Sequence, residues 1–186
     1  LSTSNKKKTF VITFDDGYED VFYNAMPLLK KFNFKATCFF VSDLIGQYNY
    51  WDEGLNNYKK IKLMNKEQVY KWLTNGFEAG AHSSNHKNLT LLGYEEKIKE
   101  ITEPKKYFNE NFKCNVKSFS YPYGLFDSET SKIVSNHYNF AVTTKRSRYT
   151  PNKFNYLSLP RVPVNRKDGS FKFFLKIKTI YEDLKY

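Results

Sequence analysis

Two adjacent carboxylates and two closely spaced imidazoles are the groups in this chain best suited to chemistry. Asp15 and Asp16 stand together in the stretch TFDDG, where an apolar run stops and a glycine begins. His82 and His86 stand four residues apart in HSSNH, and the 186 residues contain only three histidines. Each pair alone has an ordinary interpretation, a turn for the aspartates and a polar loop for the histidines.

Taken together, the two pairs predict a metal centre with a general base beside it. Imidazoles four residues apart can hold one divalent ion, and such a site needs a carboxylate ligand and an open position. One aspartate would supply that ligand, and its neighbour would remove a proton from a water molecule activated by the metal. One carboxylate cannot easily do both, because ligation consumes the lone pairs that a base needs. Two imidazoles and a carboxylate suit Zn²⁺, and Co²⁺ or Ni²⁺ fit the same ligands.

Strands that alternate with helices must position these groups. Apolar runs without alternation at Lys8–Phe14 and Lys35–Ser42 predict strands buried on both faces. Further strands are predicted over Phe77–Ser83, Val116–Gly124, Phe140–Thr144 and Tyr156–Val164. Helices are predicted over Glu19–Phe32 with a restart at Pro27, Lys66–Asn75 capped by Asn65, Gly93–Phe112 interrupted by Pro104, Ser128–His137, and Ser170–Tyr186 capped by Ser170. The expected buried side of the last helix comprises Phe171, Phe174, Leu175, Ile177, Ile180, Tyr181 and Leu184. The polar and aromatic stretch Gly46–Lys62 is predicted to be irregular.

This alternation predicts an α/β fold of parallel strands with right-handed crossovers, either an open doubly wound sheet or a barrel. In both arrangements functional residues gather at the C-terminal edge of the sheet. Asp15 and Asp16, His82 and the YPYG turn all follow predicted strands. We therefore expect them to meet at one rim.

In this order, the motifs TFDDG, HSSNH and YPYG resemble the first three motifs of the polysaccharide deacetylases. These are the NodB-homology carbohydrate esterases of family four. The resemblance runs from about Lys8 to the LPRVPV segment, and it implies a distorted (β/α) barrel that removes N-acetyl groups from amino sugars with a metal. We expect one domain over residues 1–186, with a flexible segment at residues 1–7.

The resemblance implies a role for each matched residue. Asp15 becomes the catalytic base, while Asp16, His82 and His86 become the metal ligands. The backbone N–H of Tyr123 becomes an oxyanion donor. The expected substrate-binding and oxyanion group comprises Tyr121, Pro122, Tyr123 and Arg161.

The sequence departs from the family's pattern in three places, one of which is the absence of a recognisable tryptophan-bearing motif, since Trp51 and Trp72 both lie far upstream. Many members carry an arginine two residues before the proline of the third motif, where it holds the catalytic aspartate, and Ser120 occupies that position here. Arg161 either replaces that arginine or is an ordinary surface arginine. Members also usually supply a later histidine as general acid, but LSL is followed here by Pro160 and Arg161. The remaining histidine, His137, is expected in a solvated position late in a helix.

The charge of the chain limits the kinds of partner that it is expected to bind. The net charge is +11 and the pI about 9.4, but the basic residues are scattered and no nucleic-acid-reading motif accompanies them. We expect a solvated basic surface, suited to an anionic lipid carrier or envelope surface, and no nucleic-acid site. A nucleic-acid or anionic-surface binder stays a rival class. Aromatic residues in the segment 48–51 are either a sugar-stacking platform or loop packing.

Several properties stay open at this level. The substrate could be poly-N-acetylglucosamine, peptidoglycan, a chitin-type oligomer or a lipid-linked amino sugar, and a non-catalytic, metal-holding glycan binder is the alternative function. Cys38 is expected to be a small buried hydrophobe, with a bridge to Cys114 left open. The chain begins at Leu1, so we expect a targeting segment upstream and a periplasmic or cell-surface location; a cytoplasmic one is the alternative. The oligomeric state is not predicted.

Overall fold

Six strands and the helices between them make up this computed structural model, which describes residues 10–150, 155–179 and 181–182. The strands are β1 (Ile12–Phe14), β2 (Ala36–Phe40), β3 (Glu78–Ala81), β4 (Ser118–Ser120), β5 (Phe140–Arg146) and β6 (Leu159–Arg161). The helices are α1 (Met26–Lys31), α2 (Lys66–Thr74), α3 (Tyr94–Phe112), α4 (Ser128–His137) and α5 (Ser170–Lys178). Short turns of π or 3₁₀ helix occupy Val21–Ala25, Ser42–Leu44, Tyr50–Asp52, Leu89–Leu91 and Pro122–Gly124.

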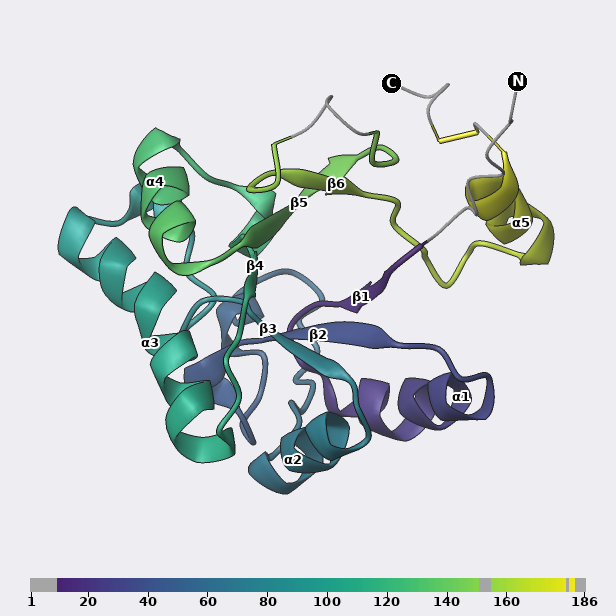
Figure 1. The fold of residues 1–186 in the computed structure, drawn as a ribbon, viewed down its shortest axis with the longest axis horizontal. Coiled ribbons are helices and arrows are strands. Elements are labelled where there is room, and N and C mark those ends of the chain that lie inside the picture. The colour runs from purple at the N-terminus through teal and green to yellow at the C-terminus, as the bar shows by residue number, and fades with distance from the viewer. Residues whose placement is uncertain (1–9, 151–154, 180, 183–186) are drawn as a thin grey trace, which may run out of the picture.

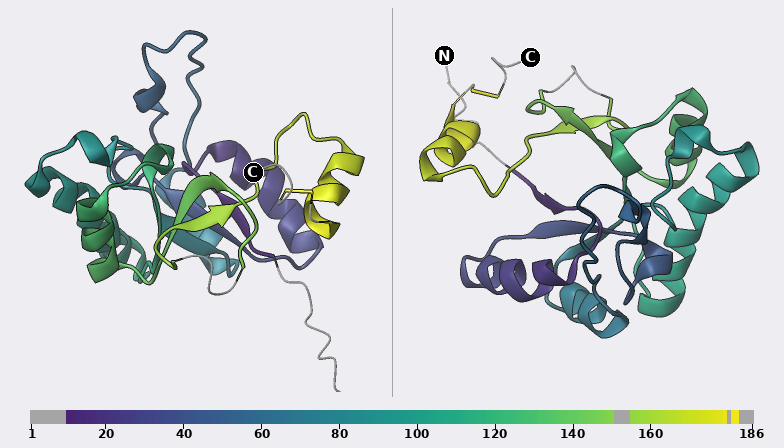
Figure 2. Two further views of the ribbon diagram at one scale, coloured as in Figure 1. Left: turned by 90° about the horizontal axis from the view of Figure 1, so that it is seen from above. Right: turned by 180° about the vertical axis from the view of Figure 1, so that it is seen from behind.

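The strands pair in chain order from β1 to β6, and every pair is parallel. A doubly wound sheet would reverse its strand order at a switch point, and this sheet does not. Figures 1 and 2 show the sheet curled into a half-barrel with α1 to α4 on its outer side. The predicted distorted (β/α) barrel is confirmed, and the doubly wound alternative is wrong.

Local signals place most of the helix starts. The Asn65 side chain accepts the Gln68 N–H at 2.9 Å, and the Gln68 side chain accepts the Asn65 N–H at 2.8 Å, so α2 begins with a complete capping box. Asp127 caps α4 with its side chain, which accepts the Thr130 N–H at 2.7 Å. Pro27 lies in the first turn of α1, directly after the π-helical turn, as the predicted restart requires.

A hydrophobic core fills the space between the sheet and its outer helices. All five residues of β2 are buried. Trp72 of α2 is fully buried and donates its indole N–H to the Glu78 carbonyl at the start of β3 at 2.9 Å. Phe108 of α3 packs against Phe40 of β2 with ring centroids 5.6 Å apart. These contacts fix the helices against the strands and so fix where the strands end.

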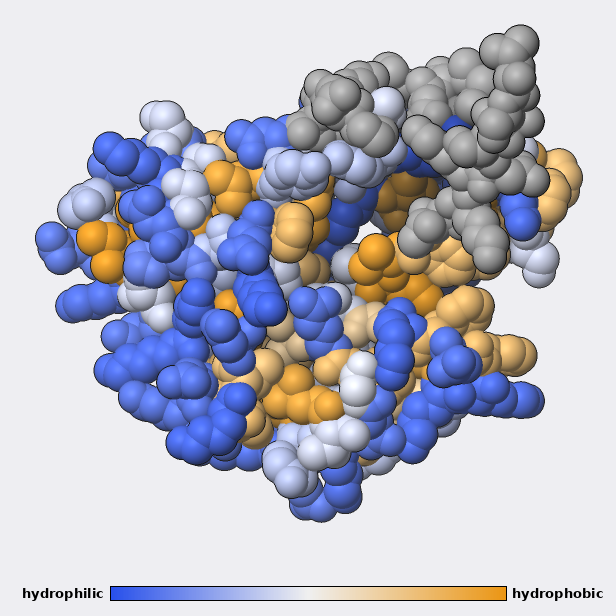
Figure 3. Space-filling view, viewed as in Figure 1, coloured by the Kyte–Doolittle hydropathy of each residue, from blue (hydrophilic) through white to orange (hydrophobic). Residues whose placement is uncertain are grey.

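The first strand is shorter and more exposed than the run Lys8–Phe14 predicts. Only Ile12–Phe14 forms β1, and its three residues are half-buried. Phe10 and Val11 are 54% and 74% exposed, and the first two residues of the run lie outside the described part. Within the described residues β1 pairs with β2 alone, and Figure 3 shows apolar side chains gathered at this open side. Burial on both faces is therefore confirmed for β2 and wrong for β1.

Helix α3 runs through Pro104 without the predicted interruption. Proline has no N–H to donate to the carbonyl four residues earlier, which belongs to Glu100. The N–H of Ser84 binds that carbonyl instead, at 3.1 Å. A tertiary hydrogen bond thus replaces the missing helical one.

Helix α5 also differs from its prediction. Gly169 is its N-cap residue, so Ser170 does not cap it. Phe171 and Phe174, predicted on its buried side, are 75% and 53% exposed. Lys176 is the buried residue, and it pairs with Asp168. The predicted core positions at 180 and 184 lie outside the described residues.

The two cysteines are both free thiols, so the bridge that the sequence left open does not form. Cys38 is buried in β2, as expected of a small hydrophobe, and burial raises the pKa of its thiol well above the ordinary value. Cys114 is half-buried beyond the end of α3.

Gly17 allows the chain to turn after β1. Its φ is +76°, and a Cβ there would lie 2.6 Å from Cδ1 of Phe40. Gly54 has a similar φ of +94°, but a Cβ at that position would meet no neighbouring group within 4 Å. Comparison of the two sites therefore separates backbone strain from steric overlap.

We predict that Gly17→Ala lowers the free energy of unfolding by about 2–4 kcal/mol, because it adds overlap with Phe40 to left-handed strain. Gly54→Ala should lose only about 1–2 kcal/mol, from strain alone. Urea unfolding followed by circular dichroism measures both. Equal losses in the two variants would contradict the packing argument.

Candidate active site

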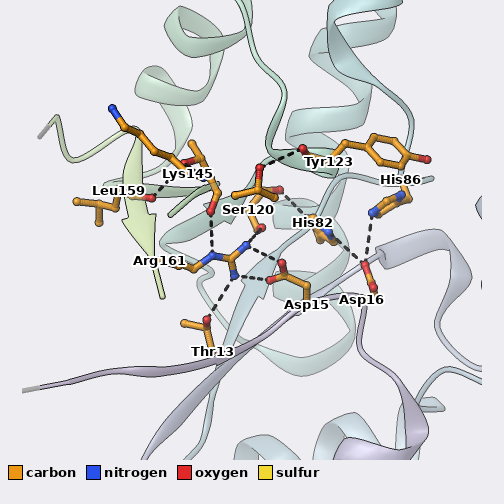
Figure 4. Close-up of polar contacts among 12 residues, drawn as sticks. Thr13, Asp15, Asp16, His82, His86, Ser120, Tyr123, Lys145, Leu159 and Arg161 are labelled. Atoms are coloured by element: carbon orange, nitrogen blue, oxygen red, sulfur yellow. Dashed lines mark hydrogen bonds and ion pairs between the residues drawn. The ribbon is translucent and has the colours of Figure 1, made fainter. Parts of the chain in front are cut away.

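Residues that follow the strands β1, β3 and β4 meet at one rim of the half-barrel (Figure 4). Asp15 and Asp16 follow β1, His82 follows β3, and the turn 121–124 follows β4. They surround a cavity of about 260 Å³. Its lining comprises Asp15, Asp16, Tyr18, Trp51, Asp52, His82, His86, Tyr121, Tyr123 and Thr144. The structure therefore brings these residues together at one rim, as the sequence predicts.

Asp16, His82 and His86 form a compact cluster of metal-ligand atoms. The Nε2 atoms of His82 and His86 lie 3.3 and 3.4 Å from the same carboxylate oxygen, Oδ1 of Asp16. All three ligand atoms lie within 4.8 Å of one another. Both imidazoles are buried, and the Asp16 side chain is 20% exposed. Solvent or substrate therefore reaches the cluster from the Asp16 side.

The cluster fits one small divalent ion. Ligand atoms about 2.1 Å from a tetrahedral ion lie about 3.4 Å apart, close to the two distances measured from Asp16. Two imidazole nitrogens and one carboxylate oxygen are one of the donor sets that Zn²⁺ uses in sites with an open position. Within the described residues this is the group of three that could hold a metal.

The two imidazoles are held in different ways. Nδ1 of His82 lies 2.7 Å from the Ser120 carbonyl, so it carries the hydrogen and leaves the Nε2 lone pair for a metal. The His86 ring instead stacks on Trp51, with centroids 4.4 Å apart and planes 27° apart. The Tyr123 ring meets His86 edge-on at 4.7 Å. Aromatic packing orients His86 where a hydrogen bond orients His82.

In the metal-free cluster the pKa values of the two imidazoles shift in opposite directions. Burial opposes the charged form of His82, but the hydrogen bond with Asp16 and the charges of Asp15 and Asp16 outweigh it and raise the pKa of His82. Burial, followed by repulsion from His82, lowers the pKa of His86 to about 4. A metal ion would displace the proton from His82, because both bind the same lone pair.

Asp15 is held by Arg161, which comes from the far edge of the sheet. Nη1 and Nη2 of the guanidinium lie 2.7 and 2.6 Å from Oδ1 and Oδ2 of Asp15, a bidentate pair. The same guanidinium donates to the Thr143 carbonyl at 3.0 Å and approaches Oγ of Ser120 at 3.4 Å. Arg161 is therefore not an ordinary surface arginine, because its guanidinium pairs with the Asp15 carboxylate.

This pairing sets the charge of Asp15. Burial opposes ionisation of the carboxyl, but hydrogen bonds from Arg161 and the charge of His82 outweigh burial, and the pKa of Asp15 falls below its ordinary value. Asp15 is therefore an ionised carboxylate at neutral pH. Its two oxygens point toward Arg161, and Asp16 points away from it toward the imidazoles (Figure 4).

The turn after β4 places tyrosines on the opposite wall. Tyr123 has a left-handed backbone, φ 59° and ψ 4°, and a side chain that is 47% exposed in the cavity. The Tyr121 ring lines the cavity, and its hydroxyl donates to the Leu157 carbonyl at 3.0 Å. Pro122 is buried under the turn and is not among the lining residues.

Four lining residues were not predicted as site residues: Tyr18, Trp51, Asp52 and Thr144. Trp51 and Asp52 belong to the irregular stretch 46–62, which Figure 2 shows projecting beyond the half-barrel. Asp52 is fixed by the buried Asn49, whose side-chain amide donates to it at 2.9 Å. The cluster of aromatic residues in this stretch was the available signal, and it left loop packing and sugar stacking equally open. His137 lies at the end of α4 and is not among the residues that line the cavity.

Comparison with known proteins assigns the family. The family model for polysaccharide deacetylase matches residues 2–140. The chain therefore belongs to the polysaccharide deacetylase family, and the sequence resemblance is confirmed.

Individual relatives agree with this assignment. The chain is 29% identical over 174 residues to a poly-beta-1,6-N-acetyl-D-glucosamine N-deacetylase of Staphylococcus aureus. The match covers 91% of this chain and 58% of that protein, so the chain spans little more than half the length of this relative.

Solved structures share the fold. The Streptococcus pyogenes deacetylase PplD, in complex with acetate, matches with a TM-score of 0.78 and 23% identity, over 94% of this chain and 72% of that one. IcaB from Ammonifex degensii matches with a TM-score of 0.72 and 21% identity, over 84% and 67% of the two chains. At these identities the likeness concerns the fold alone.

We predict that His82→Ala, His86→Ala and Asp16→Asn each lose stoichiometric Zn²⁺, because two remaining ligands hold the ion too weakly. Elemental analysis of protein equilibrated with Zn²⁺ measures the loss. His137→Ala is the matched control and should keep the metal content of the parent chain. Full zinc content in any of the three variants would remove that residue from the ligand set.

Proposed function

We propose that this chain is a metal-dependent hydrolase that removes N-acetyl groups from the amino sugars of a polysaccharide. The observation that carries the proposal is the Asp16, His82 and His86 cluster beside a separate, ionised Asp15 in one cavity. The family assignment supports the reaction class. The named activity of the Staphylococcus aureus relative makes poly-β-1,6-N-acetylglucosamine the first substrate to test.

Zn²⁺ is the proposed cofactor, with Co²⁺ or Ni²⁺ as ions that suit the same ligands. Asp16, His82 and His86 would hold it. A bound divalent ion supplies Lewis-acid chemistry by polarising the acetamide carbonyl and by making water more acidic.

Asp15 and the backbone of Tyr123 then carry out the remaining chemistry. Asp15 takes a proton from the attacking water, whose oxygen bonds to the acetyl carbon, and the N–H of Tyr123 donates to the developing oxyanion. When the carbon–nitrogen bond breaks, Asp15 returns the proton to the departing nitrogen, so acetate and a free amine are formed. Because no other histidine lines the cavity, one carboxylate serves both halves of the reaction.

The cavity wall suits a sugar ring. Tyr123 and Trp51 present aromatic surface next to the ligands, and Asp52 supplies a carboxylate that can accept hydrogen bonds from hydroxyl groups. The net charge of +11 would favour association with an anionic envelope surface or lipid carrier. A glycan polymer of the envelope would be met in the periplasm or at the cell surface. In the described part, no helix has the length and apolar character to cross a bilayer.

An acetate-release assay tests the proposal. The purified chain is incubated with poly-β-1,6-N-acetylglucosamine, chitin-type oligomers and peptidoglycan, each with Zn²⁺, Co²⁺ or a chelator. We expect release that the chelator abolishes and added metal restores. Glycan binding without acetate release under every metal condition would favour the non-catalytic glycan binder, and salt-sensitive DNA binding without release would favour the nucleic-acid class.

We predict that Asp15→Asn keeps its metal but loses at least about 100-fold in turnover, the scale expected for removing a general base. Asp16→Asn should instead lose metal first. Acetate release and elemental analysis of the two variants are compared side by side. If Asp15→Asn loses the metal and Asp16→Asn keeps it, the roles of base and ligand must be exchanged.

We predict that Arg161→Gln lowers kcat at least about tenfold at neutral pH, because Asp15 loses its bidentate partner. The acidic limb of the pH profile should also move to higher pH. The sign follows from burial: without the guanidinium, burial acts on Asp15 with less opposition, the pKa of Asp15 rises, and the active carboxylate is lost at a higher pH.

Arg161→Lys is the matched control, since lysine keeps the positive charge but cannot form the bidentate pair with Asp15. Its acidic limb should move less than that of Arg161→Gln, while its kcat still falls. An acidic limb that stays in place in both variants would show that Asp15 does not owe its ionised state to Arg161.

A further inference from the structure

The loop that carries the two histidines is anchored from behind by one buried carboxylate. Glu100 of α3 is 3% exposed, and its Oε2 accepts the N–H groups of Ser84 and Asn85 at 3.0 and 2.8 Å. Its Oε1 accepts the side-chain amide of Asn85 at 3.0 Å. These two residues stand between His82 and His86 in the chain, so Glu100 holds the backbone that separates the two proposed ligands.

Pro104 adds a second anchor from the same helix. Because it has no N–H, the Glu100 carbonyl is free to accept a hydrogen bond from the Ser84 N–H at 3.1 Å. Ser84 thus donates to both the backbone and the side chain of Glu100. A proline inside a helix ordinarily lowers the stability of the helix. Here Pro104 leaves the Glu100 carbonyl free to accept a hydrogen bond from the loop that carries the histidines.

The loop needs such support because its backbone is strained. Ser83 and His86 both have positive φ, 59° and 58°, which residues other than glycine rarely adopt. The His86 N–H is held by Oγ of Ser83 at 2.9 Å within the loop itself. From the opposite side, the Asp43 N–H donates to the Ser84 carbonyl at 3.1 Å. The loop is therefore clamped between α3 and the segment after β2.

Glu100 does not reach the reacting groups. It lines a separate charged cleft of about 540 Å³ behind the loop. Within the described part of the chain, no residue lines both this cleft and the cavity at Asp15 and Asp16. Any effect of Glu100 on the metal that is carried by contacts must therefore pass through the loop.

We propose that Glu100 and Pro104 are positioning residues that fix the loop 83–85 and thereby set the affinity and geometry of the metal site. The proposal rests on the metal site of the proposed function. Two imidazoles bind one ion more tightly when their separation is fixed before the ion arrives, and the three hydrogen bonds to the Glu100 side chain supply that fixation.

Co²⁺ titration of the metal-free chain, followed by the visible absorption of the bound ion, tests the proposal. Both the dissociation constant and the spectrum report on the ligand set without any substrate. Glu100→Gln should weaken Co²⁺ binding roughly tenfold to hundredfold and alter the spectrum. Glu103→Gln is the matched control, an exposed glutamate on the same helix, and should bind Co²⁺ as the parent chain does.

Pro104→Ala separates positioning from general stability. An alanine N–H would compete with Ser84 for the Glu100 carbonyl, while the helix itself becomes easier to form. We expect a thermal midpoint no lower than that of the parent chain, together with Co²⁺ binding weaker by at least about threefold. This variant also carries the test if Glu100→Gln does not fold.

The outcomes are distinguishable. If Pro104→Ala and a folded Glu100→Gln bind Co²⁺ with parental affinity and spectrum, the positioning role is wrong while the metal site stands. If weaker binding is matched by an equal loss in Glu103→Gln, the effect is one of helix charge, and the positioning role is again wrong. If the parent chain itself fails to bind Co²⁺, the proposed metal site falls, and the positioning role falls with it.

Discussion

The ion pair between Arg161 and Asp15 joins the two edges of the sheet. β1 and β6 are the first and last strands of the half-barrel, and the pair spans 146 positions in the chain. A bidentate guanidinium fixes both distance and orientation, so the spacing of the two edges and the direction of the Asp15 carboxylate are set by one interaction. Its removal would leave a partly buried carboxylate without a partner, which is more costly than never having formed the pair. The shape of the barrel and the state of the proposed base therefore depend on the same contact.

The parts of the site that the sequence predicted are those governed by local pattern and topology. Asp15, Asp16 and His82 follow strands, and parallel strands bring their ends to one rim, so the cluster needed no knowledge of side-chain packing. The ion pair between Asp15 and Arg161 could not be predicted in this way, because nothing near Arg161 in the chain indicates that β6 curls back toward β1. The contact between Trp51 and His86 was not predicted for a similar reason, since an irregular stretch has no periodicity from which to infer its direction.

Backbone conformation explains two further limits of prediction. Asp16, Ser83, His86 and Tyr123 all have positive φ, and none is a glycine. Sequence patterns assign that conformation to glycine, and here tertiary contacts impose it where the proposed ligands and oxyanion donor must point. Pro104 predicted an interruption of α3 that does not occur, because a hydrogen bond from a distant loop replaces the one that the proline removes from the helix. In both cases long-range contacts decided a local structure.

The two imidazoles are oriented by different kinds of contact. His82 is 3% exposed and is tied to the Ser120 carbonyl at the end of β4, within the sheet. His86 lies between the rings of Trp51 and Tyr123, and its Nδ1 has no hydrogen-bond partner among the described residues. Trp51 belongs to the stretch that projects beyond the barrel in Figure 2. A single aromatic stack therefore connects this projecting stretch to one of the proposed ligands.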